Sequence, residues 1–236
     1  MNIIKKHLDN LQFYPTVNEK KQIFLHHTAG TNAQGALDWW NQTPDHVGTA
    51  YVIDRDGTII EAFPADRWAY HIGLKGDDDF VEKNSIGIEI VSAGGLVKEG
   101  EKFMFYPLYP NKAGGREIPA SDVWEMPTGW KGFKYFHKYT DQQVRATIEL
   151  VKYLIETFKI QLQPDLNKFW EYNEEVFKSH STGLWSHSTA RKDKADIIPF
   201  PGFTKSLIEA IQTKPTLKVD KVEKVELPTK PNTKKK

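Results

Sequence analysis

The sequence contains no cysteine among its 236 residues. Disulfide bonds and structural metal sites built on thiolates are therefore excluded. Long apolar runs are missing too, since none approaches the roughly 20 residues of a membrane-crossing helix. The first residues, Met1 to His7, also lack the apolar stretch of a signal peptide. We therefore expect no membrane insertion, and synthesis in the cytoplasm without a secretion signal.

A strong net charge is also absent, because the formal total is +1. Residues 214–236 nevertheless hold eight lysines and three acidic residues, so they carry +5 and leave −4 on the rest. This Lys-rich segment has little core-forming content and is expected to be a disordered tail, with contact to an anionic wall polymer as the alternative. Residues 1–213 have an ordinary composition for one sizeable core. We expect one domain, a monomer and no nucleic-acid partner.

The most informative stretch is Gln22–Gly30. Its apolar run Ile23–Leu25 is typical of a strand that is buried on both faces of a sheet. His26 and His27 follow, and successive strand side chains point to opposite faces, so only one of them can look into a given cavity. Taken alone, the pair is more typical of two half-buried structural histidines, each hydrogen-bonded to a neighbour, than of a metal ligand.

A second polar stretch far along the chain, Trp185–Asp196, favours the interpretation that one of these histidines is a metal ligand. It adds His187 and ends in Asp196, and two imidazoles with one carboxylate make a three-ligand set that leaves the fourth position of Zn²⁺ open. Such a set is typical of a catalytic site. Lys194 is two residues before Asp196, so an extended segment places its ammonium beside the carboxylate.

Four blocks, in this order, carry a resemblance to the zinc-dependent N-acetylmuramoyl-L-alanine amidases of the amidase-2 type. That group includes phage endolysins and peptidoglycan recognition proteins. The resemblance extends from about Gln22 to Phe203 and implies an α/β single domain with a central mixed β-sheet flanked by helices. It also implies Zn²⁺ held by His26, His187 and Asp196. The blocks are Phe24–Ala29, Tyr51–Thr58, Asn84–Ile90 and His187–Asp196.

Glu89 stands out in the third block, because it is a carboxylate in an otherwise apolar strand, Ser85–Val91. A buried charge must be paired, protonated or turned to a wet cavity. A structural pair with a Lys or Arg is one interpretation. The resemblance implies the other, in which Glu89 is a general base for the attacking water. The position of Lys194 beside Asp196 adds the hypothesis that its ammonium stabilises the oxyanion.

The resemblance also suggests substrate contacts. Thr49 and Ala50 occupy positions where many relatives carry a tyrosine or histidine, so the sequence gives no support for a mechanism that needs a phenol there. His71 is as typical of a structural histidine as of a substrate contact, and His27 is equally compatible with packing. The candidate substrate-binding residues are His27, Thr49, Trp68, His71 and Asn84.

Local patterns predict the remaining elements. Residues 93–139, rich in Gly, Pro and aromatics, are expected to be an insertion with short strands of its own, forming either a satellite core or a groove wall. The other expectations are a helix over Ile3–Phe13, a helix over Ala33–Asn41 that buries Trp39, a hairpin over 51–63 beside the central strand, a helix capped by Thr140 and Gln143, a helical segment in Pro164–Lys178, and a last helix over Lys205–Ile211.

The function that the resemblance implies is hydrolysis of the amide between N-acetylmuramic acid and L-alanine, in peptidoglycan or a muropeptide. An endolysin acting on the cell wall is favoured over an exported toxin or a recycling enzyme. Two alternatives stay open: a catalytically silent peptidoglycan-binding module and a metal-dependent peptidase that cuts the stem peptide.

Overall fold

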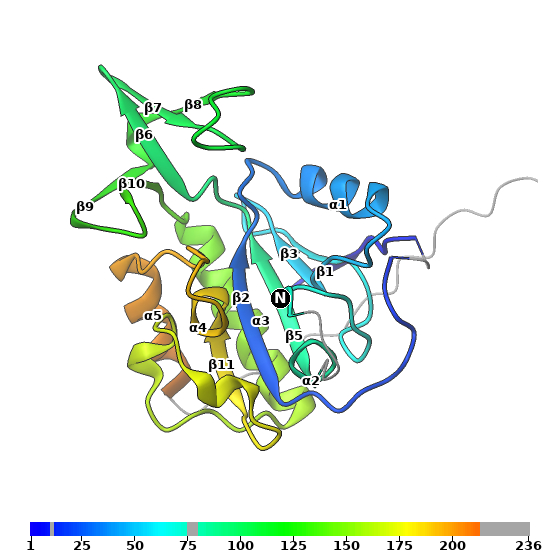
Figure 1. The fold of residues 1–236 in the computed structure, drawn as a ribbon. Helices are drawn as coiled ribbons and strands as arrows, with labels where there is room; N and C mark the ends of the chain where they lie inside the picture. The colour runs from blue at the N-terminus through cyan, green and yellow to red at the C-terminus, as the bar shows by residue number, and fades with distance from the viewer. Residues whose placement is uncertain (10–11, 75–79, 213–236) are drawn as a thin grey trace, which may run out of the picture.

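The computed structural model describes residues 1–9, 12–74 and 80–212, so the expected tail at 214–236 lies outside the described residues. Its centre is a six-stranded sheet in the order β1-β4-β3-β5-β2-β11 (Figure 1). Strands β3, β5, β2 and β11 are parallel, whereas β4 is antiparallel to β3. The expected mixed α/β sheet is confirmed. Its strands are β1 Ile3–Lys5, β2 Gln22–His27, β3 Tyr51–Ile53, β4 Ile59–Glu61, β5 Ser85–Ile90 and β11 Gly183–Ser186.

Strand β2 lies between β5 and β11, and its apolar run Ile23–Leu25 is fully buried, as a central strand requires. The predicted hairpin is present as β3 and β4. It is not the direct neighbour of β2, however, because β5 pairs with β2 on one edge and with β3 on the other. This arrangement places Glu89 one strand away from His26.

Helices cover the sheet. Helix α3, Asp141–Phe158, begins with the predicted capping box of Thr140 and Gln143. Its buried apolar residues belong to the same core cluster as Ile23 and Leu25 of β2. Figure 1 shows α3 behind the sheet with α5 beside it. The other helices are α1 Ala33–Gln42, α2 Phe80–Asn84, α4 His187–Ala190 and α5 Pro201–Gln212. No helix in the described ranges has the length and apolar character of a membrane span.

The structure differs from three local predictions. Ile3–Lys5 is a strand, because the edge of β4 offers hydrogen-bond partners that an isolated helical pattern does not reveal. In α1, Trp40 is 4% exposed and Trp39 is 58% exposed, since the buried stripe runs from Ala33 through Leu37 to Trp40.

The third difference lies in Pro164–Lys178, where the expected helical segment is reduced to two 3₁₀ turns. Asp165 begins the first turn, Leu166–Lys168, and Asn173 begins the second, Glu174–Phe177. Each side chain accepts a hydrogen bond from a backbone N–H two residues later. Such local bonding favours turns over a continuous helix.

The insertion forms a second sheet in the order β8-β7-β6-β10-β9, which confirms that it has strands of its own. Four buried residues, Ala93, Leu96, Phe105 and Ile118, make a small separate core. In Figure 1 this sheet projects from the end of the central sheet where β5 ends. The strands are β6 Gly95–Glu99, β7 Lys102–Phe105, β8 Arg116–Ile118, β9 Val123–Trp130 and β10 Phe133–His137.

Candidate functional site

The three predicted metal ligands and Glu89 gather where three parallel strands, β2, β5 and β11, end. His26 is next to last in β2, and its register partner in β5 is Glu89, so both side chains point to the same face. His187 follows the last residue of β11 and begins α4. In α/β proteins the carboxyl edge of parallel strands is the usual place for a ligand.

Asp196 returns to this edge from a loop. The backbone N–H of Ser188 donates a hydrogen bond to the carbonyl of Asp196 at 2.7 Å, which folds the segment between them back on itself. The Asp196 carboxylate thereby meets His187 although nine residues separate them. Backbone pairing, and not strand register, positions this side chain.

Three side-chain atoms then form a small triangle. His26 Nδ1 lies 3.0 Å from His187 Nδ1, and Asp196 Oδ2 lies 3.2 Å from the first and 2.9 Å from the second. The three residues are 2%, 7% and 8% exposed. Ligand atoms about 2.0–2.1 Å from a tetrahedral zinc ion would be about 3.3 Å apart. The triangle therefore has nearly the size of a zinc ligand set, and these residues could hold a metal ion.

The outer hydrogen bonds of the histidines decide which atoms carry protons. His187 Nε2 lies 2.9 Å from the carbonyl oxygen of Ile72, which can only accept, so Nε2 carries the hydrogen. Nδ1 of His187 therefore faces the Asp196 carboxylate, where it can donate a proton or offer its lone pair to a cation. Two imidazole nitrogens and one carboxylate oxygen that meet within 3.2 Å are a donor set that fits a bound metal.

Electrostatics keep these groups in the form that binds cations. Burial, with the neighbouring His187, lowers the pKa of His26 to about 4. Burial alone would raise the pKa of Asp196, but His187 and His26 hold it well below its ordinary value. The site therefore presents a neutral His26 imidazole and an ionised Asp196 carboxylate at neutral pH.

Glu89 lies close enough to this triangle for the Asp196 charge to act on it. Its Oε2 is buried and has no hydrogen bond within the described residues. Burial raises the pKa of Glu89 well above its ordinary value, the Asp196 charge adds to this, and the Lys194 ammonium opposes it. The Lys194 charge also lowers the pKa of His26, so Lys194 lies close enough to influence both groups. The expected salt bridge of a purely structural glutamate is not formed with the described residues.

The structure places His71 behind His26. His71 Nδ1 lies 2.9 Å from His26 Nε2, and its own Nε2 lies 2.8 Å from Ser85 Oγ. Burial and the charges of His26 and His187 hold the pKa of His71 well below its ordinary value. Gly87 makes the space, because a Cβ there would approach His71 Nδ1 to 3.0 Å.

The other candidate substrate contacts are not brought to the triangle. His27 points to the opposite face of β2, where its buried Nδ1 has no partner in the described residues. The Thr49 hydroxyl is buried and donates to the Tyr51 carbonyl, and Trp68 is buried against Tyr14. Asn84 precedes β5, at the far end from Glu89, about 16 Å away by strand rise.

Sequence reasoning missed two residues beside the site. Glu82 in α2 is almost fully buried, and its carboxylate accepts four backbone N–H groups of residues 71–74. Ser85 joins His71 to the Val81 carbonyl. Neither residue type at these positions gives a sequence signal, because their partners are backbone atoms and a histidine from another segment.

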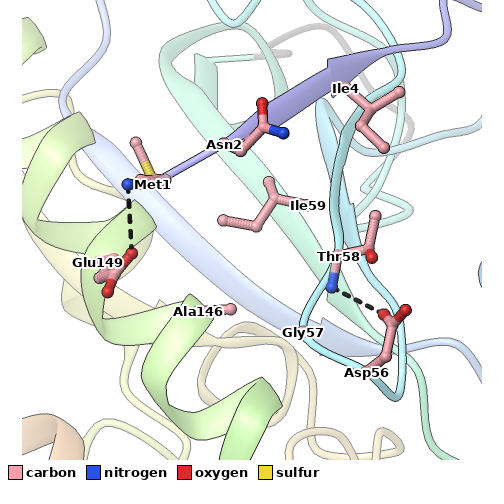
Figure 2. A pocket seen from close by; sticks show the side chains of 9 residues that line it. All are labelled: Met1, Asn2, Ile4, Asp56, Gly57, Thr58, Ile59, Ala146 and Glu149. Atoms are coloured by element: carbon pink, nitrogen blue, oxygen red, sulfur yellow. Dashed lines mark hydrogen bonds and ion pairs between the residues drawn. The ribbon is translucent and has the colours of Figure 1, made fainter. Parts of the chain in front are cut away.

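Two hollows lie elsewhere on the molecule. Figure 2 shows one of about 260 Å³ beside the N-terminus, where the Met1 amino group lies 3.7 Å from Glu149 and the Thr58 N–H donates to Asp56. A second, of about 540 Å³, is lined by residues 161–165 and by Trp185 among others. Neither hollow is lined by a predicted site residue. The convergence of side chains, and not either hollow, locates the candidate site.

Comparisons with known proteins find the same fold in solved structures. Solved structures with similar folds include a mutant of PlyL (15% identity, 91% of this chain and 100% of that chain, TM-score 0.52) and the catalytic domain of XlyA (15%, 88% and 99%, TM-score 0.50). The Staphylococcus aureus hydrolase AmiA in complex with its ligand is similar too (12%, 89% and 81%, TM-score 0.50). None of the curated protein sequences compared with the chain matches it.

A family model described as N-acetylmuramoyl-L-alanine amidase matches residues 17–202. The matched segment contains the carboxyl edge of β2, β5 and β11 and the whole triangle of His26, His187 and Asp196. The chain therefore belongs to the Amidase_2 family of N-acetylmuramoyl-L-alanine amidases, enzymes that hydrolyse an amide bond of peptidoglycan.

Proposed function

We propose that the protein is a zinc-dependent amidase in which His26, His187 and Asp196 hold the ion. The observation that carries this proposal is the triangle of two imidazole nitrogens and one carboxylate oxygen with sides of 2.9–3.2 Å. Three ligands leave the fourth position of tetrahedral Zn²⁺ for the reaction. Because all three come from one chain, the site needs no partner copy, and we propose that the monomer is active.

Residues around the triangle have distinct roles in this proposal. His26, His187 and Asp196 would hold a zinc ion, which would supply Lewis-acid polarisation of the scissile carbonyl and make an attacking water more acidic. Glu89 accepts the proton of that water, since its raised pKa brings its basicity closer to neutral pH. The same carboxyl group then delivers the proton to the leaving amine. Lys194 stabilises negative charge on the carbonyl oxygen.

The substrate bond is proposed from family membership. The match to N-acetylmuramoyl-L-alanine amidases supports the amide between the lactyl group of N-acetylmuramic acid and L-alanine. We further propose that the enzyme acts on the cell wall in the manner of an endolysin.

Mass spectrometry of digested sacculi tests this proposal. The zinc-loaded enzyme should release stem peptides with a free L-alanine amino terminus, and the Glu89→Gln variant should not. Unchanged sacculi would indicate a binding module, and cleavage inside the stem would indicate a peptidase; either result would overturn the amidase assignment.

A further inference from the structure

One short loop touches both candidate histidine ligands. This loop, residues His71–Leu74, follows the segment that carries Trp68. Its first residue offers the His71 imidazole to His26 Nε2 at 2.9 Å, and its second offers the Ile72 carbonyl to His187 Nε2 at 2.9 Å. Outer partners of this kind fix the tautomer and orientation of metal-binding histidines.

A single buried carboxylate holds the loop in shape. Glu82 Oε2 accepts the backbone N–H groups of His71 at 2.8 Å and Ile72 at 3.1 Å. Glu82 Oε1 accepts those of Gly73 at 2.8 Å and Leu74 at 3.1 Å. Each carboxylate oxygen has two lone pairs, so the group is fully used by four consecutive donors. Within the described residues, the hydrogen bonds of this buried carboxylate all go to the 71–74 loop, so the carboxylate defines the conformation of the loop.

A single set of histidine tautomers satisfies every hydrogen bond from His26 through His71 and Ser85 to Val81. If His26 Nδ1 offers its lone pair to a cation, its Nε2–H donates to His71 Nδ1. His71 Nε2–H then donates to Ser85 Oγ at 2.8 Å, and the Ser85 hydroxyl donates to the Val81 carbonyl. Val81 adjoins Glu82 in α2, so the chain of hydrogen bonds that starts at His26 ends on the helix that carries Glu82.

We propose that Glu82 and the 71–74 loop are a positioning device that fixes both histidine ligands at once, with His71 aligning His26 and the Ile72 carbonyl aligning His187. This inference rests on the proposed metal site, but it concerns how tightly and in which tautomer that site is held. Loss of such outer partners typically weakens metal affinity about 10- to 100-fold.

A matched pair of substitutions at His71 tests the device. Asparagine carries its side-chain oxygen at the position of Nδ1, so His71→Asn keeps an acceptor for His26, whereas His71→Leu removes it. Competition with a chelator should give His71→Leu a Zn²⁺ dissociation constant about 10- to 100-fold above wild type. His71→Asn should recover most of that loss. Equal affinities for the two variants would overturn the role of His71.

Glu82→Gln tests the clamp, because an amide has one acceptor oxygen for four N–H donors. We expect weaker Zn²⁺ binding than in His71→Leu, since both histidines lose their support. Glu61→Gln, another buried carboxylate in the central sheet, is the control and should bind as wild type does. Nitrogen NMR should show both histidine ligands with Nε2 protonated in wild type and mixed tautomers in Glu82→Gln.

These measurements separate two failures. A wild-type protein that binds no Zn²⁺ would overturn the proposed function itself. A wild type that binds Zn²⁺ while Glu82→Gln binds it equally well, with unchanged tautomers, would overturn only the positioning device. Melting temperatures measured without metal identify any variant that is misfolded. If Glu82→Gln is misfolded, the difference in Zn²⁺ affinity between His71→Asn and His71→Leu tests the positioning device instead.

Discussion

Buried ionisable groups at the two ends of one face of the central sheet differ in how completely they are hydrogen-bonded. At the amino end, Lys20 is 3% exposed, and its ammonium donates to the carbonyls of Arg67, Lys83 and Ser85 at 2.6–3.1 Å. At the carboxyl end, polar atoms of His26, His187 and Asp196 meet within 3.2 Å, and Glu89 Oε2 has no partner in the described residues. The buried charged group at the amino end is therefore fully paired, although the neighbouring Gln22 Oε1 has no partner in the described residues, whereas the carboxyl end leaves an ionisable oxygen unpaired.

This difference shows where stability and chemistry lie. A satisfied buried ammonium contributes to a fixed structure, whereas uncompensated acceptors cost free energy unless a cation or a substrate meets them. Gln22 and His26 are on the same face of β2, about 13 Å apart by strand rise. We therefore expect substitutions at the carboxyl end to abolish activity, and those at the amino end to lower stability.

The largest effect should come from His26→Ala. Removing one of three ligand atoms leaves too few to hold Zn²⁺ tightly, so hydrolysis of cell walls should fall to the detection limit. The matched control is His27→Ala, one residue further on β2 but on the opposite face. Turbidity assays with cell walls compare the activities of the two variants. An equal loss of activity in both would contradict the assignment of the metal site to the His26 face of β2.

The second-largest loss of activity should come from Glu89→Gln. It removes the proton acceptor and keeps the shape, so kcat should fall about 10²- to 10⁴-fold while Zn²⁺ binding persists. In wild type, kcat/KM should decrease as the pH falls through the raised pKa of Glu89, because the protonated form cannot accept a proton. That acidic limb should be lost in the variant. Full activity of Glu89→Gln would contradict the assigned role.

Lys194→Met should lower kcat about 10²-fold, since one group that stabilises the oxyanion is lost and the aliphatic stem is kept. Zn²⁺ affinity should change little, because Lys194 is not a ligand. Steady-state kinetics on a soluble muropeptide measure this effect. A change in KM alone would show that Lys194 binds substrate and does not stabilise the transition state.

The smallest effect on catalysis should come from Lys20→Met, which acts on stability. Burial lowers the pKa of Lys20 to about 7, although the nearby Asp66 opposes this. Between pH 7 and 10 the unfolded chain holds the Lys20 proton more tightly than the folded chain does. This difference makes the free energy of unfolding rise with pH, by up to about 1.4 kcal/mol per unit.

Removing Lys20 should abolish this contribution and leave three carbonyls unpaired, at a cost of about 1–3 kcal/mol. Urea unfolding of wild type and Lys20→Met at several pH values measures both quantities. The same pH slope in the two proteins would show that Lys20 stays charged throughout.

The members of the triangle could be predicted from the sequence, but not the way in which they meet. Strand periodicity separated His26 from His27 and put Glu89 on one face of its own strand, and the resemblance of the ordered blocks brought in His187 and Asp196. The pairing of β2 with β5, and the loop that returns Asp196, depend on contacts between distant segments. The capping box of α3 is local, since Thr140 and Gln143 bond to each other's backbone.

Other features depend on contacts between distant segments. Nothing near Glu82 in the sequence shows that its carboxylate bonds to residues 71–74. The position of the His71 imidazole likewise depends on its hydrogen bonds to His26 and Ser85, which lie in other segments. Trp39 is exposed because the core contacts set the rotation of α1, which adjacent tryptophans do not reveal. The segment at Ile3–Lys5 became a strand because β4 was available as a partner.

The metal content of the purified protein tests the central claim most directly. After dialysis against Zn²⁺ and removal of the excess, elemental analysis should find about one zinc ion per wild-type chain and far less in Asp196→Asn. Hydrolysis should disappear on chelation and return with added Zn²⁺. A wild type that stays fully active with no bound metal would contradict the account.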